Sequence, residues 1–142
     1  MRQALVLADE SAGQGEVPVG ALVVLAGHVV GRGRNMPIST HDPTAHAEVV
    51  ALRDAGRRVG NYRLPGATLY VTVEPCLMCV GAIVHARIAT VVYGATEPRA
   101  GAVESRQRGF EHPGLNHRVT VVAGVLARDC SARLTEFFKE RR

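Results

Sequence analysis

The chain has few aromatic residues and no tryptophan. Three tyrosines and three phenylalanines make up 4% of its 142 residues. Proteins that bind single-stranded nucleic acids along a groove stack many bases on aromatic side chains, so an extensive stacking surface is not expected. No apolar run reaches the roughly 18 residues of a membrane span, and the start MRQALVLADESAG lacks the zones of a signal peptide. We therefore expect a cytoplasmic protein with no membrane segment.

Cysteine is also scarce. The chain has three, an odd number that does not fit the disulfide framework of a secreted domain. Two of them form the motif Cys76-x-x-Cys79, whose spacing is typical of metal or redox sites. Cys130 falls in a predicted helix and is expected to be a small core residue. The cysteines therefore indicate a reducing compartment and single out the Cys76 motif.

Lysine is nearly absent, since Lys139 is the one lysine among 17 basic residues. Against 13 acidic residues they give a formal charge of +4. This balance favours a polyanionic partner only weakly, because a solvated basic surface would give the same charge. Hydrophobic residues (46%) and charged residues (21%) are present in ordinary globular proportions. The length fits one domain over residues 1–142.

Short Val-rich runs alternate with helical patterns along the chain. The predicted strands are the two runs on either side of the hairpin signal Ala26-Gly27, followed by residues 67–73, 89–95 and 118–125. The predicted helices cover residues 2–12, 43–55 and 75–88, with a closing helix to about residue 140. This alternation predicts an α/β fold in which a mixed sheet of about five strands has helices on both faces.

Two segments do not fit this alternation. Residues 96–117 are rich in glycine, proline and charge and show no clear period, and residues 34–43 are a shorter stretch of the same kind. Long irregular segments inside a compact domain are usually functional or disordered. Both segments are therefore candidates for the lining of a substrate cleft.

The stretch PTAHAEVVALRDAG, residues 43–56, is predicted to open as a helix, with Asp42 as its cap and Pro43 in its first position. His46 and Glu48 are two residues apart in it. At about 100° per residue their side chains would diverge by roughly 200° around a helix. They should not grip one ion from a single face, so we expect a different role for each.

Cys76 and Cys79 are one helical turn apart, directly after a proline that can open a helix. The positive end of a helix dipole stabilises thiolate, which is the form that binds metal. Together with His46 they make a Cys2His set that leaves one position of a tetrahedral zinc open for water. Glu48 could then move the protons of that water, which is the chemistry of hydrolytic deamination.

Each part of this set has a simpler interpretation. His46 and Glu48 could be a surface pair or satisfied core groups, and the cysteines could be a redox pair, half of a structural zinc site or buried thiols. A closed structural site would need a fourth ligand, for which the chain offers His41, His85, His112 and His117. The combination of all four groups at two helix starts favours a catalytic zinc.

The segments HAE and PCLMC resemble the zinc signature of the cytidine deaminase-like superfamily. EVPVGALVV, HDPTAHAE, NYRL, ATLYVTVEPCLMC and HPGLNHRV are similar to the bacterial tRNA-specific adenosine deaminases, so the resemblance covers nearly the whole chain. It implies a zinc-dependent deaminase domain over residues 1–142 with a three-layer α/β/α fold. It also implies deamination of adenosine to inosine at the wobble position of a tRNA anticodon, chiefly of an arginine tRNA, by a homodimer.

The resemblance also implies roles for individual residues. One Zn²⁺ per subunit would be bound by His46, Cys76 and Cys79, and Glu48 would shuttle protons. The residues that match the family's substrate contacts are Asn35 and the backbone N–H of Ala47 at the flipped base, Glu97 near the sugar of a neighbouring nucleotide, and Arg99 at a phosphate. Glu97 stands where the family commonly has an aspartate. The closing FFKERR would lie near the anticodon loop, and we expect Arg106 and Arg108 to add charge there.

Two rival functions remain open from the sequence. The same scaffold and zinc could serve a deaminase of a free base or nucleoside, such as guanine or cytosine, in a closed pocket. A rival of another class is a zinc module that binds nucleic acid without catalysis. That module would keep its function after Glu48→Ala, whereas a deaminase would lose turnover with zinc still bound.

Overall fold

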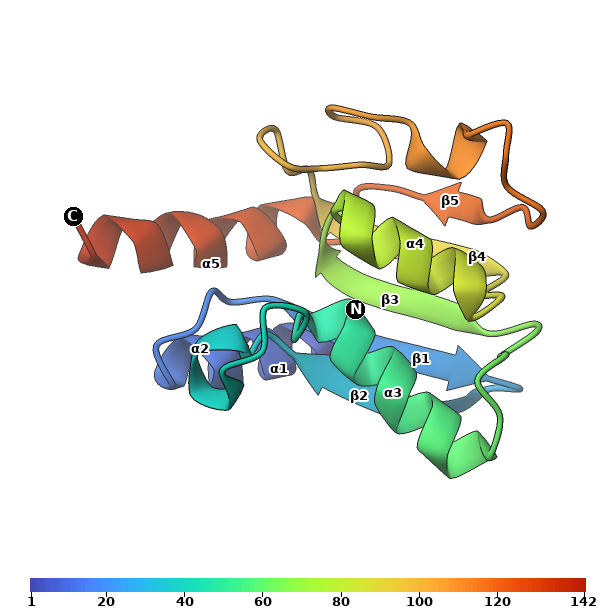
Figure 1. Cartoon of the computed structure of the whole chain (residues 1–142). Helices are drawn as coiled ribbons and strands as arrows, with labels where there is room; N and C mark the ends of the chain where they lie inside the picture. The colour runs from blue at the N-terminus through green and yellow to red at the C-terminus, as the bar shows by residue number, and fades with distance from the viewer.

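The computed structural model describes all residues from Met1 to Arg142 (Figure 1). Its strands are β1 (Gly20–Leu25), β2 (His28–Arg34), β3 (Thr68–Val73), β4 (Thr90–Ala95) and β5 (Thr120–Val122). They form one sheet in the order β2-β1-β3-β4-β5. β1 is antiparallel to both β2 and β3, whereas β3, β4 and β5 run parallel. This confirms the predicted mixed sheet of five strands.

The turn between β1 and β2 is the predicted hairpin. Ala26 and Gly27 both have positive φ, at 51° and 78°. Two successive residues with positive φ are typical of a type I′ turn, whose twist matches that of the strands it joins.

Helices cover both faces of the sheet and complete the predicted three layers. The helices are α1 (Arg2–Gly13), α2 (Pro37–Thr40), α3 (Ala47–Val59), α4 (Leu77–His85) and α5 (Ala127–Glu140), with a short 3-10 helix η1 (Gly109–Glu111). α3 and α4 lie on one face, and α1 and α5 lie on the other (Figure 1). Most of the buried apolar side chains form one core cluster that joins the sheet to α3 and α4. No helix of the chain is both long and apolar enough to cross a membrane.

α3 packs directly on β2 because two glycines of the strand face it. A Cβ added to Gly31 or Gly33 would overlap backbone atoms of the helix, at Ala51 and Ala47 respectively. The absence of side chains at these two positions therefore sets how closely the first two to three turns of α3 approach the sheet.

The sheet topology brings the beginnings of α3 and α4 to the same end of the sheet, where β2 and β3 finish. β2 and β3 run in the same direction, since each is antiparallel to β1. The chain therefore leaves both strands at the same end of the sheet. It enters α2 and α3 after β2, and it enters α4 after β3. The crevice beyond the carboxyl ends of strands is the usual ligand site of open α/β sheets.

The irregular segment of residues 96–117 is folded against the domain. It consists mainly of turns, and η1 contacts α4, where Phe110 is buried in the main core. Its lack of a helical or strand period is explained by this turn structure, which is held together by contacts with other parts of the chain.

Candidate active site

α3 begins later than predicted. We expected Asp42 to cap the helix, but α3 starts at Ala47, and His46 is its N-cap in an extended conformation (φ −74°, ψ 152°). The Asp42 carboxylate instead accepts hydrogen bonds from the backbone N–H of Thr44 at 2.8 Å and from its hydroxyl at 2.7 Å. Such local turns of aspartate compete with helix formation. The predicted divergence of roughly 200° does not apply, because only Glu48 of the pair lies in the helix.

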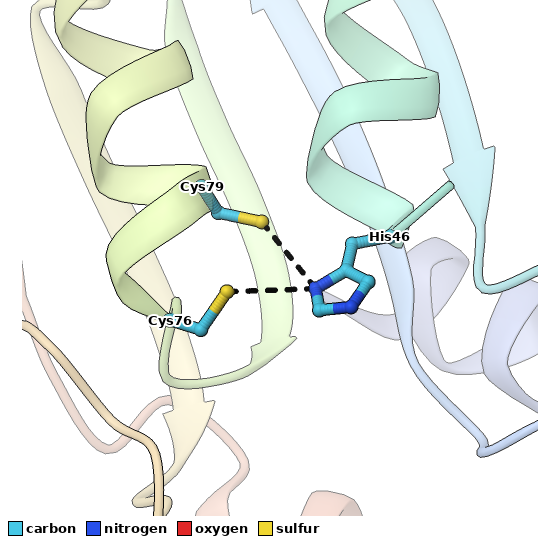
Figure 2. A group of neighbouring side chains, drawn as sticks. All are labelled: His46, Cys76 and Cys79. Atoms are coloured by element: carbon cyan, nitrogen blue, oxygen red, sulfur yellow. Dashed lines mark hydrogen bonds between the residues drawn. The ribbon is translucent and has the colours of Figure 1, made fainter. Parts of the chain in front are cut away.

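α4 begins at Leu77, next to its cysteines and two residues after the predicted start at Pro75, and it ends at His85 instead of at residue 88. Cys76 is the N-cap in an extended conformation (φ −79°, ψ 174°), and Cys79 lies in the first turn. The two sulfur atoms point toward the imidazole of His46, which projects from the start of the neighbouring α3 (Figure 2). Two helix N-termini therefore supply the three side chains of one cluster.

The geometry of this cluster fits Zn²⁺. The three ligand atoms lie within 4.8 Å of one another. His46 Nδ1 is 3.5 Å from Cys76 Sγ and 3.6 Å from Cys79 Sγ. Tetrahedral zinc with ordinary Zn–S and Zn–N bond lengths would place nitrogen and sulfur about 3.6 Å apart. The donor set and its spacing therefore suit one zinc ion.

No fourth protein ligand joins the three, because no other histidine, cysteine, aspartate or glutamate belongs to the group. His117 Nε2 instead pairs with the Ile88 carbonyl at 2.7 Å, and His112 Nδ1 accepts the Gly114 N–H at 3.1 Å. His41 and His85 are exposed. A closed structural site is therefore disfavoured, and an open coordination position is the pattern of catalytic zinc.

Hydrogen bonds among the three side chains shift the pKa of each. Hydrogen bonds from the Cys79 thiol and from His46 lower the pKa of Cys76 to about 4. Donation to Cys76 together with burial raises the pKa of the Cys79 thiol, and the hydrogen bond to Cys76 raises the pKa of His46. The cluster thus favours one thiolate, and zinc binding would release the remaining protons.

Glu48 is buried in the first turn of α3, with 4% of its surface exposed. Burial raises the pKa of its carboxyl to about 7, and the charge of Cys76 adds to this. The carboxylate is not a member of the ligand group. It is therefore a carboxyl near the cluster that can hold or release a proton close to neutral pH.

Asn35 and Ala47 are joined to each other. Asn35 follows β2 directly and is 9% exposed, and its Oδ1 accepts the backbone N–H of Ala47 at 2.9 Å. Its own backbone N–H donates to the Val19 carbonyl at 3.0 Å. The Ala47 N–H is therefore engaged by Asn35, which leaves the Asn35 amide NH2 as the donor of this pair.

Glu97 and Arg99 lie on the segment that follows β4. The Glu97 carboxylate accepts the backbone N–H of Arg99 at 2.9 Å, so it closes a local turn. A single β-bridge between Cys76 and Gly101 ties the same segment to the start of α4. The structure thus brings this segment to the metal cluster, although the predicted contacts of Glu97 and Arg99 with RNA stay predictions.

Two buried glutamates next to the site escaped the sequence analysis. Glu74 follows β3 directly and is 3% exposed, and Glu16 precedes β1 and is 1% exposed. Glu16 accepts the backbone N–H of Ser39 at 2.8 Å and so holds the segment that leads to α3. Each is a single acidic residue beside a predicted apolar strand, and that position was the available signal.

Comparison with known proteins agrees with this geometry. Residues 1–95 match the family model of the cytidine and deoxycytidylate deaminase zinc-binding region. The chain is 50% identical over 143 aligned residues to the tRNA-specific adenosine deaminase of Haemophilus influenzae, covering 100% of this chain and 83% of that protein. It is 45% identical to the protein of the same name from Agrobacterium fabrum, with 100% and 93% covered.

Solved structures of two kinds of deaminase are also similar to this chain. A structure from studies of A-to-I editing by tRNA:A34 deaminases at the wobble position of transfer RNA matches with a TM-score of 0.92 and 45% identity, covering 94% of this chain and 97% of that one. Guanine deaminase from Bacillus subtilis matches with a TM-score of 0.67 and 33% identity, covering 99% and 90%. The chain therefore belongs to the zinc-binding cytidine and deoxycytidylate deaminase family and, within it, to the tRNA-specific adenosine deaminases.

Proposed function

We propose that this protein deaminates adenosine to inosine at the wobble position of a tRNA anticodon, chiefly of an arginine tRNA, and that it acts in the cytoplasm as a zinc-dependent homodimer. The observation that carries the proposal is the open His46, Cys76 and Cys79 cluster with Glu48 buried beside it but outside the ligand set. Its substrate class is supported by relatives named tRNA-specific adenosine deaminases that match the whole of this chain at 50% and 45% identity.

The reaction converts adenosine and water into inosine and ammonia. When bound by His46, Cys76 and Cys79, Zn²⁺ supplies Lewis-acid activation by lowering the pKa of a water molecule toward neutrality. The Glu48 carboxylate takes a proton from the attacking water and delivers it to the leaving nitrogen. Its burial keeps bulk water from competing for that proton, and its place outside the ligand set leaves it free to carry it.

Asn35 would orient the base. Because its Oδ1 is fixed by the Ala47 N–H at 2.9 Å, its NH2 group is directed to a ring nitrogen acceptor of the flipped adenine. In this arrangement Ala47 acts on the base through Asn35. Glu97 and Arg99 would meet the sugar and phosphate of neighbouring nucleotides from the segment after β4.

The basic residues around that segment would bind the RNA backbone. Arg99, Lys139, Arg141 and Arg142 line one open cavity between the segment after β4 and the end of α5. Arginine and lysine on phosphates give an affinity that falls steeply with salt. Substituting these residues, together with Arg106 and Arg108, should therefore weaken stem-loop binding and reduce its salt dependence.

The proposed dimer would use the outer side of α3 and α4. A groove there is lined by Val49, Leu52, Ala82, Ala86 and Tyr62, which is 70% exposed, together with polar residues that include Arg53, Arg57, Asn61 and His85. A second copy of the chain would cover this mixed apolar and polar surface. Light scattering on the zinc-loaded protein should give twice the mass of the chain.

The main alternative is a deaminase of a free base. The tRNA deaminase is favoured because its structure is 45% identical to this chain, whereas guanine deaminase from Bacillus subtilis is 33% identical. Its TM-score of 0.92 is also higher than the 0.67 of that structure and the 0.83 of guanine deaminase from Nitrosomonas europaea.

A panel of substrates tests the proposal. The zinc-loaded protein is incubated with an anticodon stem-loop bearing adenosine at the wobble position, and separately with free adenosine, cytidine and guanine. Inosine is expected in the stem-loop and no product from the free compounds, and Glu48→Gln is the matched control for contaminating activity. Deamination of a free base with no inosine in the stem-loop would contradict the proposal.

A further inference from the structure

We propose that Glu74 is the positioning residue that builds the loop of residues 97–105 and fixes it beside Cys76, so that Glu97 and Arg99 are presented at the mouth of the active site. The structural part of this inference stands on the contacts of Glu74. Its kinetic part rests on the proposed function.

The Glu74 carboxylate is the centre around which loop 97–105 closes. Its Oε1 accepts the consecutive backbone N–H groups of Val103, Glu104 and Ser105 at 3.1, 2.8 and 2.9 Å. Its Oε2 accepts the Glu97 N–H at 2.9 Å and the Ser105 hydroxyl. Consecutive N–H groups that converge on one point form an anion-binding concavity. Here the resident anion comes from the protein itself.

Five hydrogen-bond donors converge on the Glu74 carboxylate, namely four backbone N–H groups and the Ser105 hydroxyl. Residues 97–105 form no helix or strand. Without the anion, four backbone N–H groups would therefore lose their partner.

The same loop is attached to the residue that precedes the first cysteine. The Ala102 N–H donates to the Pro75 carbonyl at 2.8 Å, and Gly101 forms the β-bridge with Cys76. Gly101 has no room for a side chain, because an added Cβ would overlap the Glu74 carboxylate. Glu74, Pro75 and Cys76 therefore hold three successive points of the loop, and the loop lies beside Cys76.

This attachment determines where Glu97 and Arg99 lie. Glu74 binds the Glu97 N–H, and the Glu97 carboxylate binds the Arg99 N–H at 2.9 Å. The turn that carries both side chains is thus built outward from Glu74. A change at Glu74 should release this turn while the zinc ligands stay in place.

The variant Glu74→Gln separates this role from a general one. The amide keeps the shape of the side chain, but its NH2 replaces one acceptor oxygen and faces N–H groups that need an acceptor. Ser105→Ala is a milder variant that removes one partner of the same carboxylate. Glu10→Gln is the matched control, because Glu10 is 54% exposed on α1 and its nearest cation, Arg34, is 3.9 Å away.

Amide hydrogen exchange on the zinc-loaded full chain measures directly how often loop 97–105 opens. In Glu74→Gln we expect the Glu97, Val103, Glu104 and Ser105 amides to exchange about tenfold faster or more, with a smaller increase in Ser105→Ala. Amides of β3 and β4 exchange through global unfolding, and they should be accelerated by a smaller factor than the loop amides, which open locally. Glu10→Gln should match the wild type throughout.

Kinetics on the anticodon stem-loop give a second, independent readout. Loss of a contact made equally in ground and transition states raises KM and leaves kcat nearly unchanged. For Glu74→Gln we expect KM to rise about tenfold with kcat within about threefold, and one zinc per subunit.

Two results would overturn the inference. Unchanged exchange of the loop amides in Glu74→Gln would show that Glu74 does not set the loop. Equal acceleration of loop and sheet amides would show a residue of general stability instead. A wild-type protein that forms no inosine would count against the proposed function alone, because the exchange measurement needs no substrate.

Discussion

The regions around Glu48 and Glu74 use the same chemical group in opposite ways. Both carboxylates are almost completely buried, with 4% and 3% of their surface exposed, and both lie near the beginning of a helix that supplies zinc ligands. The pKa of Glu48 is raised to about 7, whereas the pKa of Glu74 is lowered. Burial is therefore not what distinguishes them.

The difference lies in the hydrogen-bond donors that each region provides. Glu74 receives four backbone N–H groups and one hydroxyl, which outweigh the cost of burying its charge. At Glu48, burial and the charge of Cys76 outweigh the hydrogen bonds with its own backbone N–H and with Cys79, so the protonated form is favoured. A carboxylate saturated with donors acts as a scaffold, and one left with few donors can exchange a proton.

Removing a ligand from the Glu48 region should have the largest effect. In Cys79→Ala the cluster keeps one sulfur and one imidazole, which is too few for a stable tetrahedral site. We expect zinc to be lost and inosine formation to fall about a thousandfold or more, as measured by metal analysis and by a stem-loop assay. Cys130→Ala is a matched control, since Cys130 is a free cysteine outside the cluster, and it should retain full zinc.

Removing the Glu74 carboxylate should lower the free energy of unfolding. Glu74→Ala leaves four backbone N–H groups without an acceptor, and we expect a loss of about 3 kcal/mol in the free energy of unfolding. For a chain of this size that corresponds to a Tm lower by roughly 10 °C, measured by circular dichroism. A loss below about 1 kcal/mol would mean that water replaces Glu74 without cost.

Lowering the pH should remove the contribution of Glu74 to the free energy of unfolding. Because its native pKa is lower than its unfolded pKa, its stabilisation is complete above the unfolded pKa of about 4.3 and is lost as pH falls through the native pKa. The gap in unfolding free energy between wild type and Glu74→Gln should be full at pH 7 and shrink below about pH 4. Urea unfolding at both pH values measures it, and a gap that widens in acid would contradict the assignment.

An exposed carboxylate should matter least. Glu111 pairs with Arg108 at 3.3 Å, but both side chains are about two-thirds exposed. Exposed ion pairs contribute little, so Glu111→Gln should change the free energy of unfolding by less than about 0.5 kcal/mol. A larger change in thermal unfolding would show that exposure does not weaken this pair.

Much of the fold was predictable because its signals are local. The Val-rich runs and the positive-φ turn at Ala26-Gly27 identify the strands and the hairpin, and Pro75 marks the beginning of α4 within two residues. The grouping of His46, Cys76 and Cys79 was also predictable, because their types and spacing suit zinc.

The features that were missed depend on contacts distant in sequence or on competition between local structures. Asp42 forms a local turn with Thr44 instead of capping a helix, so α3 starts at Ala47. Loop 97–105 has no pattern of its own, because Glu74, more than 20 residues away, defines it. The hydrogen bond of Asn35 to Ala47 depends on how closely β2 and α3 pack.

The division of labour between His46 and Glu48 is tested most directly by measuring zinc content and inosine formation in one preparation of Glu48→Gln. The prediction is one zinc per subunit with kcat lower by about 10²–10⁴-fold, because the proton carrier is lost and the ligands are intact. Loss of zinc together with activity would make Glu48 a ligand, and retained activity would remove it from the reaction. Either result would contradict the assignment of one residue to the metal and the other to the proton.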